Sequence, residues 1–449
     1  MAKGRSQFIC QQCGASFPKW TGKCENCGEW NSLVEQAPAE KGASAVARSS
    51  GRGTALKGLQ LSETAAETVA ERLTTGIDDL DTVLGGGFLP GGVVLVAGQP
   101  GIGKSTLLAQ VSAFVGRKHQ VLYVSGEESA SQVKLRAERL GAADASGLQL
   151  ASSNSAEDIA ASIQTGQYEL VVVDSIQTLS LAEISSAPGS VSQITNSSNV
   201  IIRAAKAANT AVILVGHVTK EGSIAGPKVL EHLVDVVLNF EGDRYGGFRV
   251  VRAQKNRYGS TNEAAIFEMD ETGLRIVANP SAALLAERQN LDGSIVLATM
   301  EGARPLLVEI QALVNPTSFG YPKRAASGFD LNRLNLLIAV LEKRTKLTLS
   351  DKDIYVNVVG GLKLSDPAAD LAVAMAIASA SAGRKLSDEA VVFGEVGLGG
   401  EVRSATQWHA RIKEAKKLGF TFAIAPKTHQ DAFVHGVSDL RQALIDYLQ

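Results

Sequence analysis

The sequence predicts an α/β protein in which a parallel sheet carries helices on both faces, with a small metal-binding segment before it and an α+β domain after it. Three observations support this prediction. Short β-branched runs alternate with helical patterns in the middle of the chain, four cysteines gather near its start, and the residues after Pro280 contain a separate series of apolar segments.

Length and charge narrow the possible classes of protein. With 449 residues the chain has room for about three domains, and its formal net charge of −2 excludes a histone-like basic protein and an acidic disordered one. A local basic patch is enough to bind nucleic acid, so that class stays open. No apolar run is long enough to span a bilayer, and the first residues lead into no signal peptide. We therefore expect a cytoplasmic protein without a membrane partner.

The four cysteines form two matched pairs, Cys10 with Cys13 and Cys24 with Cys27, and each pair is followed by a glycine. Four thiolates at this spacing predict a structural zinc site within a finger over residues 1–33. Zn²⁺ binding would supply most of the folding energy of so small a segment. The alternative is a redox pair or incidental cysteines.

Around the cysteines, Lys19, Trp20, Lys23 and Trp30 form an aromatic and basic set. Such side chains stack on or contact nucleic acid, and they equally suit a protein-docking face, so both alternatives stay open. After the finger, residues 34–58 are rich in Ala, Ser and Gly and lack periodic bulky apolar residues. This composition predicts a flexible linker.

Residues 59–279 carry the alternating pattern of the predicted sheet. The expected strands are 93–97, 121–125, 170–174 and 212–215, and the expected helices include 106–115 and 131–140. The later apolar segments 234–240, 248–253 and 265–268 are closely spaced, which favours antiparallel strands. A boundary is expected near Asn279, and residues 280–449 are expected to form an independent domain.

A phosphate-binding loop follows the first expected strand and opens the first helix. Its sequence fits the pattern G-x4-G-K-[ST], and that strand-to-helix context is the one the pattern requires. Backbone N–H groups and the helix N-terminus would hold the phosphates of ATP, with Lys104 at the β- and γ-phosphates and Ser105 on Mg²⁺. The residues expected to bind the nucleotide are Gly98, Gln99, Pro100, Gly101, Ile102, Gly103, Lys104, Ser105 and Thr106.

Polar residues at the ends of neighbouring strands complete the predicted site. Asp174 ends the third expected strand, where a carboxylate orients Mg²⁺ and its water. Glu127, with Glu128 in reserve, follows the second strand and is expected to polarise the attacking water. His217, after the fourth strand, lies near the γ-phosphate in this interpretation or is a structural histidine.

These motifs resemble those of known ATPases. Residues 75–81 (TGIDDLD), residues 84–88 (LGGGF) and the phosphate loop resemble the RecA/KaiC group, and the finger together with residues 255–259 (KNRYG) narrows the resemblance to the RadA (Sms) family of bacterial DNA repair proteins. The resemblance covers essentially the whole chain. It implies a RecA-like core that forms a homo-oligomer, a hexameric ring, on single-stranded and branched DNA. It also implies a DNA-dependent ATPase that acts with RecA recombinase in branch migration.

The KNRYG run places two cations two residues apart. Lys255 and Arg257 would complete the ATP site of a neighbouring subunit, as an arginine finger does, or hold DNA phosphates. We expect a role that joins nucleotide state to DNA binding, with a charged turn as the structural alternative. By analogy with RecA-like ATPases, the loops after Ser175 and His217 are expected to face the ring channel.

Residues 280–449 resemble the proteolytic domain of Lon. In this comparison Ala368 takes the place of the nucleophilic serine, and Arg411 lies in the region where Lon has its general-base lysine. Alanine has no hydroxyl and arginine is no base near neutral pH, so we expect no peptidase activity. The domain would then be a scaffold of the ring. It also contains a loose set of basic residues that could bind duplex DNA or could be plain solvated surface: Arg304, Lys323, Arg324 and Arg333.

Two functions from other classes compete with a DNA motor. One is a nucleotide-regulated platform for proteins, similar to KaiC, in which DNA plays no part. The other is an ATP-dependent protease. Stimulation of ATP hydrolysis by single-stranded DNA would distinguish a DNA motor from the protein platform. Ala368, in the place of the nucleophilic serine, argues against the protease.

Overall fold

The computed structural model describes residues 7–10, 16–26, 28, 30, 32–36, 71–141, 145–217, 229–242, 248–317 and 320–448. By contact these divide into two compact units, Met1–Asn239 with Gln254–Gly259 and Phe240–Ala253 with Ser260–Gln449. The chain passes between the units within β9 (Val236–Gly242) and β10 (Arg249–Asn256). The predicted boundary at 279/280 stays a prediction, as does the linker, most of which lies outside the described residues.

The first unit is built on a sheet with the strand order β9-β4-β8-β7-β5-β6. Its further strands are β4 (Val93–Gly98), β5 (Val121–Ser125), β6 (Leu148–Ser152), β7 (Leu170–Asp174) and β8 (Ala211–His217). The pairs β4–β8, β8–β7, β7–β5 and β5–β6 are parallel. This confirms the four strands predicted from β-branched runs, because such runs suit strands buried on both faces.

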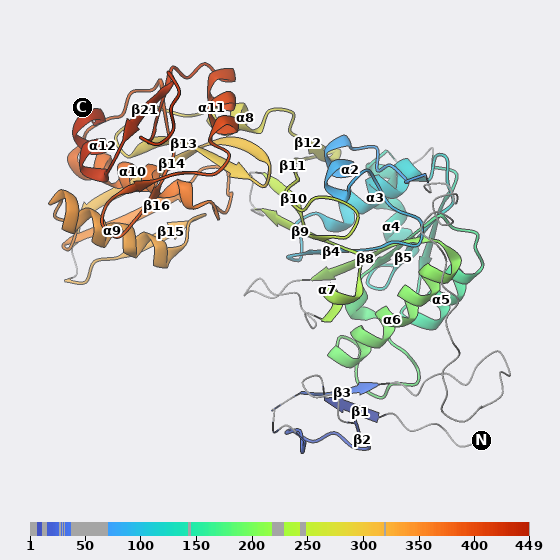
Figure 1. Cartoon of the computed structure of the whole chain (residues 1–449). Coiled ribbons are helices and arrows are strands. Elements are labelled where there is room, and N and C mark those ends of the chain that lie inside the picture. Colours follow the sequence, from blue (N-terminus) through green and yellow to red (C-terminus); the bar gives the residue numbers. More distant parts are fainter. Residues whose placement is uncertain are drawn as a thin grey trace, which may run out of the picture. The chain divides into compact units, whose positions relative to one another are not determined.

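Helices cover both faces of this sheet (Figure 1). They are α2 (Asp78–Leu84), α3 (Lys104–Val115), α4 (Ala130–Arg139), α5 (Ala156–Gln164), α6 (Val191–Ala208) and α7 (Val229–Leu233). The picture places α2, α3 and α4 on one face and α5, α6 and α7 on the other. The alternate residues Val93, Leu95 and Ala97 of β4 share a core with α5 and α6, as the period of a strand requires.

The cysteine segment is a small sheet of strand order β2-β1-β3 within the first unit. Its strands are β1 (Gln7–Cys10), β2 (Ser16–Phe17) and β3 (Leu33–Gln36). The strand β3 also contacts α6: the Glu35 carbonyl accepts from Asn196 Nδ2 at 3.0 Å and from the Ser192 hydroxyl. This ribbon is therefore joined to the helix layer by hydrogen bonds.

The second unit contains a mixed sheet of order β15-β16-β14-β13-β17-β20-β21. These strands are β13 (Ser294–Glu301), β14 (Arg304–Pro316), β15 (Arg324–Ser327), β16 (Lys352–Val358), β17 (Ala390–Val392), β20 (Phe422–Pro426) and β21 (Val434–Val437). The antiparallel pairs β13–β14 and β14–β16 adjoin parallel ones. The antiparallel arrangement expected near residues 248–268 is also present, because β10 pairs antiparallel with β11 (Ala264–Asp270) and β11 with β12 (Gly273–Ile276).

The helices of the second unit are α8 (Pro280–Leu285), α9 (Leu331–Thr345), α10 (Asp370–Ala382), α11 (Trp408–Lys417) and α12 (Leu440–Tyr447). The helices α9 and α12 pack on α10, while α8 and α11 pack on β14. Every residue from Asp370 to Ser379 is buried, which the small and apolar composition of α10 permits. Among the described residues, the structure has no helix that combines the length and the apolar character needed to cross a bilayer.

Candidate active site

The predicted phosphate-loop, magnesium and water-activating residues of the first unit meet at one edge of the parallel sheet. Since parallel strands end at the same edge, Gly98, Ser125, Asp174 and His217 all lie where β4, β5, β7 and β8 end. The register confirms the proximity, because Gly98 pairs with His217 and Ser125 with Asp174. This edge is the usual place for a ligand in an open α/β sheet.

The loop between β4 and α3 has the backbone of a phosphate cradle. Gly101 and Gly103 have φ angles of +77° and +115°, in the left-handed region where a side chain is strained. Gly103 is the N-cap residue, and α3 begins at Lys104, so the helix opens directly after the loop glycines, as predicted. The N–H groups of a helix's first turn have no acceptor within the helix, and together with the glycine backbone before them they fit the phosphates of ATP.

Lys104 is 4% exposed and is held over this loop. Its ammonium donates to the carbonyls of Gly98 at 2.8 Å and Gln99 at 3.0 Å, and lies 3.2 Å from Nδ1 of His217. An ammonium has only donors, so Nδ1 accepts and the proton of a neutral His217 is on Nε2. The predicted phosphate-binding lysine and the predicted histidine are therefore in direct contact.

Glu127 joins the same network from the end of β5. Its Oε1 accepts from the Ser175 hydroxyl at 2.6 Å and lies 3.4 Å from Nε2 of His217. Burial favours a raised pKa for this carboxyl, but the bonds from Ser175 and His217 and the charge of Lys104 outweigh burial, and the pKa of Glu127 is lowered. An ionised carboxylate beside the phosphate loop can accept a proton from water.

The neighbouring carboxylate, Glu128, contacts a different part of the protein. It forms an ion pair with Arg136 of α4, and its backbone N–H donates to Ser125 Oγ at 2.9 Å. The two candidates named for water activation thus differ in environment, and only Glu127 contacts His217. This supports Glu127, which stays a prediction.

Asp174 is buried and bound by a tyrosine. The hydroxyl of Tyr123, in the middle of β5, donates to Asp174 Oδ2 at 2.6 Å. Burial, and then the charge of Asp174, raise the pKa of Tyr123 well above its usual value, so the phenol stays protonated. Ser105 and Asp174 are the two oxygen donors predicted for Mg²⁺, and hydroxyl and carboxylate oxygens are the kind of ligand that Mg²⁺ prefers.

Lys255 does not lie in this network. It belongs to β10, which extends to Asn256 and not only to residue 253 as predicted. Its ammonium donates to the backbone carbonyls of Glu231 at 2.6 Å and Val234 at 2.7 Å, at the end of α7. Burial, and then the nearby charge of Arg257, lower the pKa of Lys255.

Arg257 pairs with a buried carboxylate of the same chain. Its guanidinium donates to Asp235 Oδ1 at 2.9 Å, while Oδ2 accepts from the backbone N–H of Val93 at the start of β4. Burial, and then the charge of Asp235, raise the pKa of Tyr258 to about 12. The KNRYG run is thereby tied to the strand that leads into the phosphate loop.

The predicted zinc ligands are described in part. Cys10 and Cys24 are both 1% exposed and pack with Leu33 in a small core. Cys13 and Cys27 lie outside the described residues. Within the described part of the chain, no cluster of three or more ligating side chains is present. Two buried cysteines on neighbouring segments fit the predicted thiolate site.

Models of three protein families match this chain. An AAA domain matches residues 60–223, a rubredoxin metal binding domain matches residues 8–35, and the subunit ChlI of Mg-chelatase matches residues 334–429. The first match covers the phosphate loop and the strand ends, and the second covers all four cysteines. The third falls within the second unit.

Curated relatives match over almost the full length. The DNA repair protein RadA of Bacillus subtilis (strain 168) is 50% identical over 99% of both chains. That of Brucella abortus (strain 2308) is 48% identical over 95% of this chain and 92% of its own. The chain belongs to the DNA repair protein RadA family. A crystal structure of the RadB recombinase covers 46% of this chain and 99% of its own, with 27% identity and a TM-score of 0.37.

Family membership confirms the resemblance and the predicted fold class, a RecA-like P-loop ATPase core between a zinc ribbon and a C-terminal α+β Lon protease-like domain. In this RadA-family chain the region predicted to correspond to the Lon active centre holds an ion pair. Arg411, 1% exposed, donates to Asp366 Oδ2 at 2.6 Å and to the Ala298 carbonyl at 2.7 Å. Asp366 also accepts from the backbone N–H of Ala368 at 3.0 Å. Burial opposes ionisation of Asp366, but Arg411 outweighs it and the pKa of Asp366 is lowered.

The loose basic set of the RadA-family C-terminal domain is only partly available for other contacts. Arg333 holds Asp370 of α10 with two hydrogen bonds, one of them from Nε to Oδ1 at 2.9 Å. Arg324 donates to Asn335 Oδ1 at 3.4 Å. Arg333 therefore joins α9 to α10, a role outside the two alternatives given for the basic set, DNA contact and solvated surface. DNA contact by the set stays a prediction.

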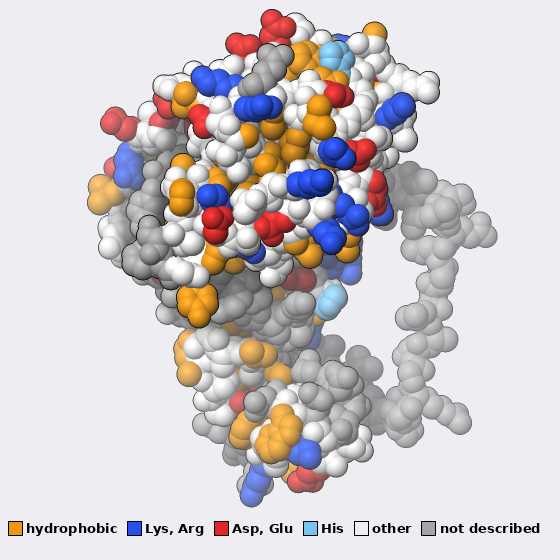
Figure 2. All heavy atoms as spheres, turned by 90° about the vertical axis from the view of Figure 1, so that its left-hand side faces the viewer, with side chains coloured by type: hydrophobic (Ala, Val, Ile, Leu, Met, Phe, Trp, Pro, Cys, Tyr) orange, Lys and Arg blue, Asp and Glu red, His pale blue; other side chains and the backbone are white. Residues whose placement is uncertain are grey.

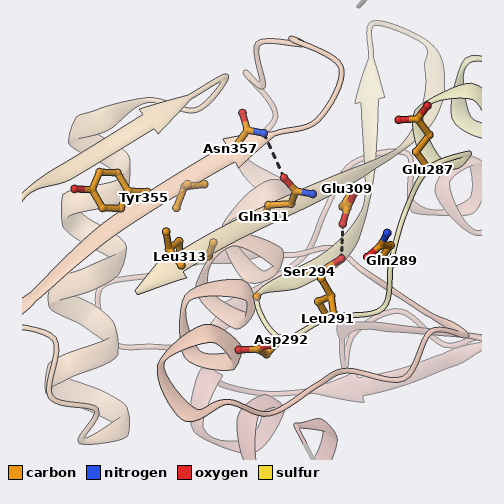
Figure 3. A pocket seen from close by; sticks show the side chains of 13 residues that line it. Glu287, Gln289, Leu291, Asp292, Ser294, Glu309, Gln311, Leu313, Tyr355 and Asn357 are labelled. Atoms are coloured by element: carbon orange, nitrogen blue, oxygen red, sulfur yellow. Dashed lines mark hydrogen bonds between the residues drawn. The ribbon is translucent and has the colours of Figure 1, made fainter. Parts of the chain in front are cut away.

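A cavity of about 530 Å³ lies in the second unit, on β13, β14 and β16 (Figure 3). Its polar side chains bond to one another: Ser294 donates to Glu309 at 2.5 Å and Asn357 to Gln311 at 3.5 Å. None of its lining residues is among the predicted site residues of this RadA-family chain.

Sequence reasoning missed three residues that bond to predicted site residues: Tyr123, Ser175 and Asp235. Tyr123 stands in an apolar strand and looks like core, although a hydroxyl in a buried strand always needs a partner. Ser175 directly follows the predicted Asp174, and this adjacency was an available signal. Asp235 bonds to Val93 far away in the sequence, and no local pattern indicates that contact.

Proposed function

We propose that this protein is a DNA-dependent ATPase, a DNA motor of recombinational DNA repair that promotes branch migration together with RecA. One observation carries the proposal: the phosphate loop, Glu127, Asp174 and His217 converge at one sheet edge, in a chain of the DNA repair protein RadA family. ATP bound there would contact residues 98–106, and Mg²⁺ would be held by Ser105 and Asp174. When bound, the metal neutralises charge on the phosphates.

The residues of the chain divide the chemical work. Lys104 supplies positive charge where negative charge develops on the transferred phosphoryl group. Glu127 accepts the proton of the attacking water, and Ser175 and His217 hold its carboxylate in place. His217 contacts both Lys104 and Glu127, so it is placed to respond when the phosphates change.

The mechanical part of the proposal concerns the KNRYG run. Lys255 donates to backbone carbonyls at the end of α7. The loop before this helix, residues 219–229 with Lys220 and Lys228, is proposed to grip DNA. Most of that loop lies outside the described residues. In the proposed hexameric ring of identical subunits, Lys255 and Arg257 would exchange these contacts for the ATP of a neighbouring subunit. This exchange would couple the nucleotide state of one subunit to DNA binding by the next.

DNA contact is also proposed for the ribbon and the C-terminal domain. Lys and Arg side chains are interspersed with Asp and Glu on the face shown in Figure 2, so local groups rather than a single-sign field would bind phosphates. Zn²⁺ on the four cysteines would hold the ribbon folded. The Lon-like domain is proposed to be a non-proteolytic scaffold.

Lys104→Ala tests the ATPase assignment. It removes the ammonium that contacts Gly98, Gln99 and His217, and we expect ATP hydrolysis to fall by at least about a hundredfold with the fold intact. Steady-state phosphate release and circular dichroism check this. Normal hydrolysis by the variant would contradict the assigned site.

Lys255→Ala tests the coupling. We expect nucleotide binding to persist and the stimulation of hydrolysis by single-stranded DNA to be lost. Lys206→Ala is a matched control, since Lys206 is exposed and 3.8 Å from Asp235. Equal stimulation in both variants would remove Lys255 from the coupling, and absence of stimulation in the unmodified protein would favour a protein-binding platform.

A further inference from the structure

We propose that Tyr123 is a positioning residue of the ATP site, whose hydroxyl fixes the Asp174 carboxylate for magnesium. This inference rests on the proposed function and deepens it. Tyr123 is 1% exposed and lies on β5, next to the strand β7 that Asp174 ends. The hydrogen bond of its phenol goes to the Asp174 carboxylate and not to the phosphate-loop backbone or Glu127, so it would act through Asp174.

The geometry singles out one oxygen of the carboxylate. The Tyr123 hydroxyl donates to Asp174 Oδ2 at 2.6 Å, a short bond of the kind a neutral donor forms with an ionised acceptor. With Oδ2 bound to the phenol, Oδ1 is the oxygen left for the metal or its water. Carboxylates that ligate metals are usually oriented by such outer hydrogen bonds.

The ring of Tyr123 gives this hydrogen bond a rigid support. A tyrosine ring packed in the sheet is stiff, because only two side-chain torsions have to be fixed. Tyr123 is buried and β5 pairs with β7, so the phenol holds the Asp174 carboxylate in one orientation.

A purely structural role makes a different prediction. Phenylalanine keeps the ring and its packing and removes one hydroxyl. If that hydroxyl served only the core, its loss would lower thermal stability and leave the metal dependence of nucleotide binding unchanged. If it orients Asp174, its loss weakens binding only when magnesium is present.

The test is binding of mant-ADP to the full-length protein, in EDTA and in saturating Mg²⁺. For Tyr123→Phe we expect an affinity in EDTA within about twofold of the unmodified protein, and a loss of about tenfold in the gain that Mg²⁺ provides. An unchanged gain overturns the proposal. Affinity lost equally in EDTA also overturns it, because the hydroxyl then supports the fold of the site.

Two further variants sharpen the result. Tyr168→Phe is the matched control: Tyr168 donates to Gln149 at 2.9 Å in the same unit, and we expect no change in the magnesium gain. In an Asp174→Asn background, Tyr123→Phe should lower the magnesium gain by less than about a further twofold, because the effects of interacting residues are not additive. Full additivity overturns action through Asp174. The assay needs neither DNA nor turnover, so a failure of DNA stimulation would sink the proposed function and leave this result standing.

Discussion

At the scale of single residues, the nucleotide site is two chains of hydrogen bonds that start from different strands. One runs from Lys104 through His217 to Glu127 and Ser175, and the other joins Tyr123 to Asp174. The first sets the protonation of the proposed base. The second sets the orientation of a proposed metal ligand.

Ser175→Ala tests the first chain through its pH dependence. The Ser175 bond helps to lower the pKa of Glu127, so its removal raises that pKa. A larger fraction of Glu127 is then protonated and inactive at acidic pH. We expect the acid limb of the kcat/KM profile to move to higher pH, with near-normal rates above both pKa values.

The matching variant is Glu127→Gln, for which we expect a loss of about 10²–10⁴-fold in kcat at all pH values. Initial rates measured from pH 8 down to below the usual pKa of a Glu carboxyl, about 4.3, provide the comparison. An acid limb that stays in place in Ser175→Ala would mean that another group controls it.

The sequence anticipated these residues unevenly. Gly98, Lys104, Asp174 and Glu127 each follow a recognisable strand, so local pattern was enough to name them. The partners that orient them depend on which strands are neighbours, and strand order is not written in periodicity. Tyr123 meets Asp174 only because β5 lies beside β7.

At the scale of elements, helices and strands are joined by a few buried charges. Arg411 of α11 reaches Asp366 before α10 and the Ala298 carbonyl of β13. Asp235 similarly links β4 to the KNRYG run in the first unit. Breaking such a pair destabilises the fold strongly, because removing one partner leaves a buried charge without its counter-ion.

Arg411→Ala should therefore destabilise the second unit by about 3–5 kcal/mol. Since the pKa of Asp366 is lowered on folding, this stabilisation is present above the usual Asp range and is lost as pH falls through the lowered value. Urea unfolding of the full chain at pH 7 measures the loss. Arg403→Ala is the control, as Arg403 is 59% exposed in its pair with Glu401.

The element bounds themselves were well predicted where a strand is buried on both faces. β5 and β7 match their predicted ranges, since their apolar runs end at polar residues. β10 was predicted too short, because its last residues, Gln254, Lys255 and Asn256, are polar and carry no hydrophobic signal.

At the scale of the whole molecule, the ribbon presents aromatic rings to solvent. Trp20 and Trp30 are 56% and 68% exposed and flank Gly22, and the Lys23 ammonium lies 5.6 Å from the Trp30 ring centre. The sequence left nucleic acid and protein as alternatives for this face, and exposure alone does not choose between them.

Tryptophan fluorescence offers the test, because the third tryptophan, Trp408, is stacked on His409 and His429 in the second unit. If bases stack on the ribbon, oligo-dT should quench the emission, and Trp20→Ala with Trp30→Ala should weaken binding by about 1–3 kcal/mol per lost stack. Trp408→Phe should keep the quenching. Intact DNA binding without quenching would assign the ribbon to a protein partner.

The buried pair of Arg411 and Asp366 has an evolutionary consequence. A serine introduced at position 368 would lie beside Asp366, whose carboxylate holds the Arg411 guanidinium, and a guanidinium takes up no proton near neutral pH. A change that removed Arg411 first would leave the buried Asp366 carboxylate without its partner and destabilise the fold. Each single change toward the Ser–Lys pair expected in Lon is therefore unfavourable, and we expect variants of this chain to keep Arg411 and Asp366 together.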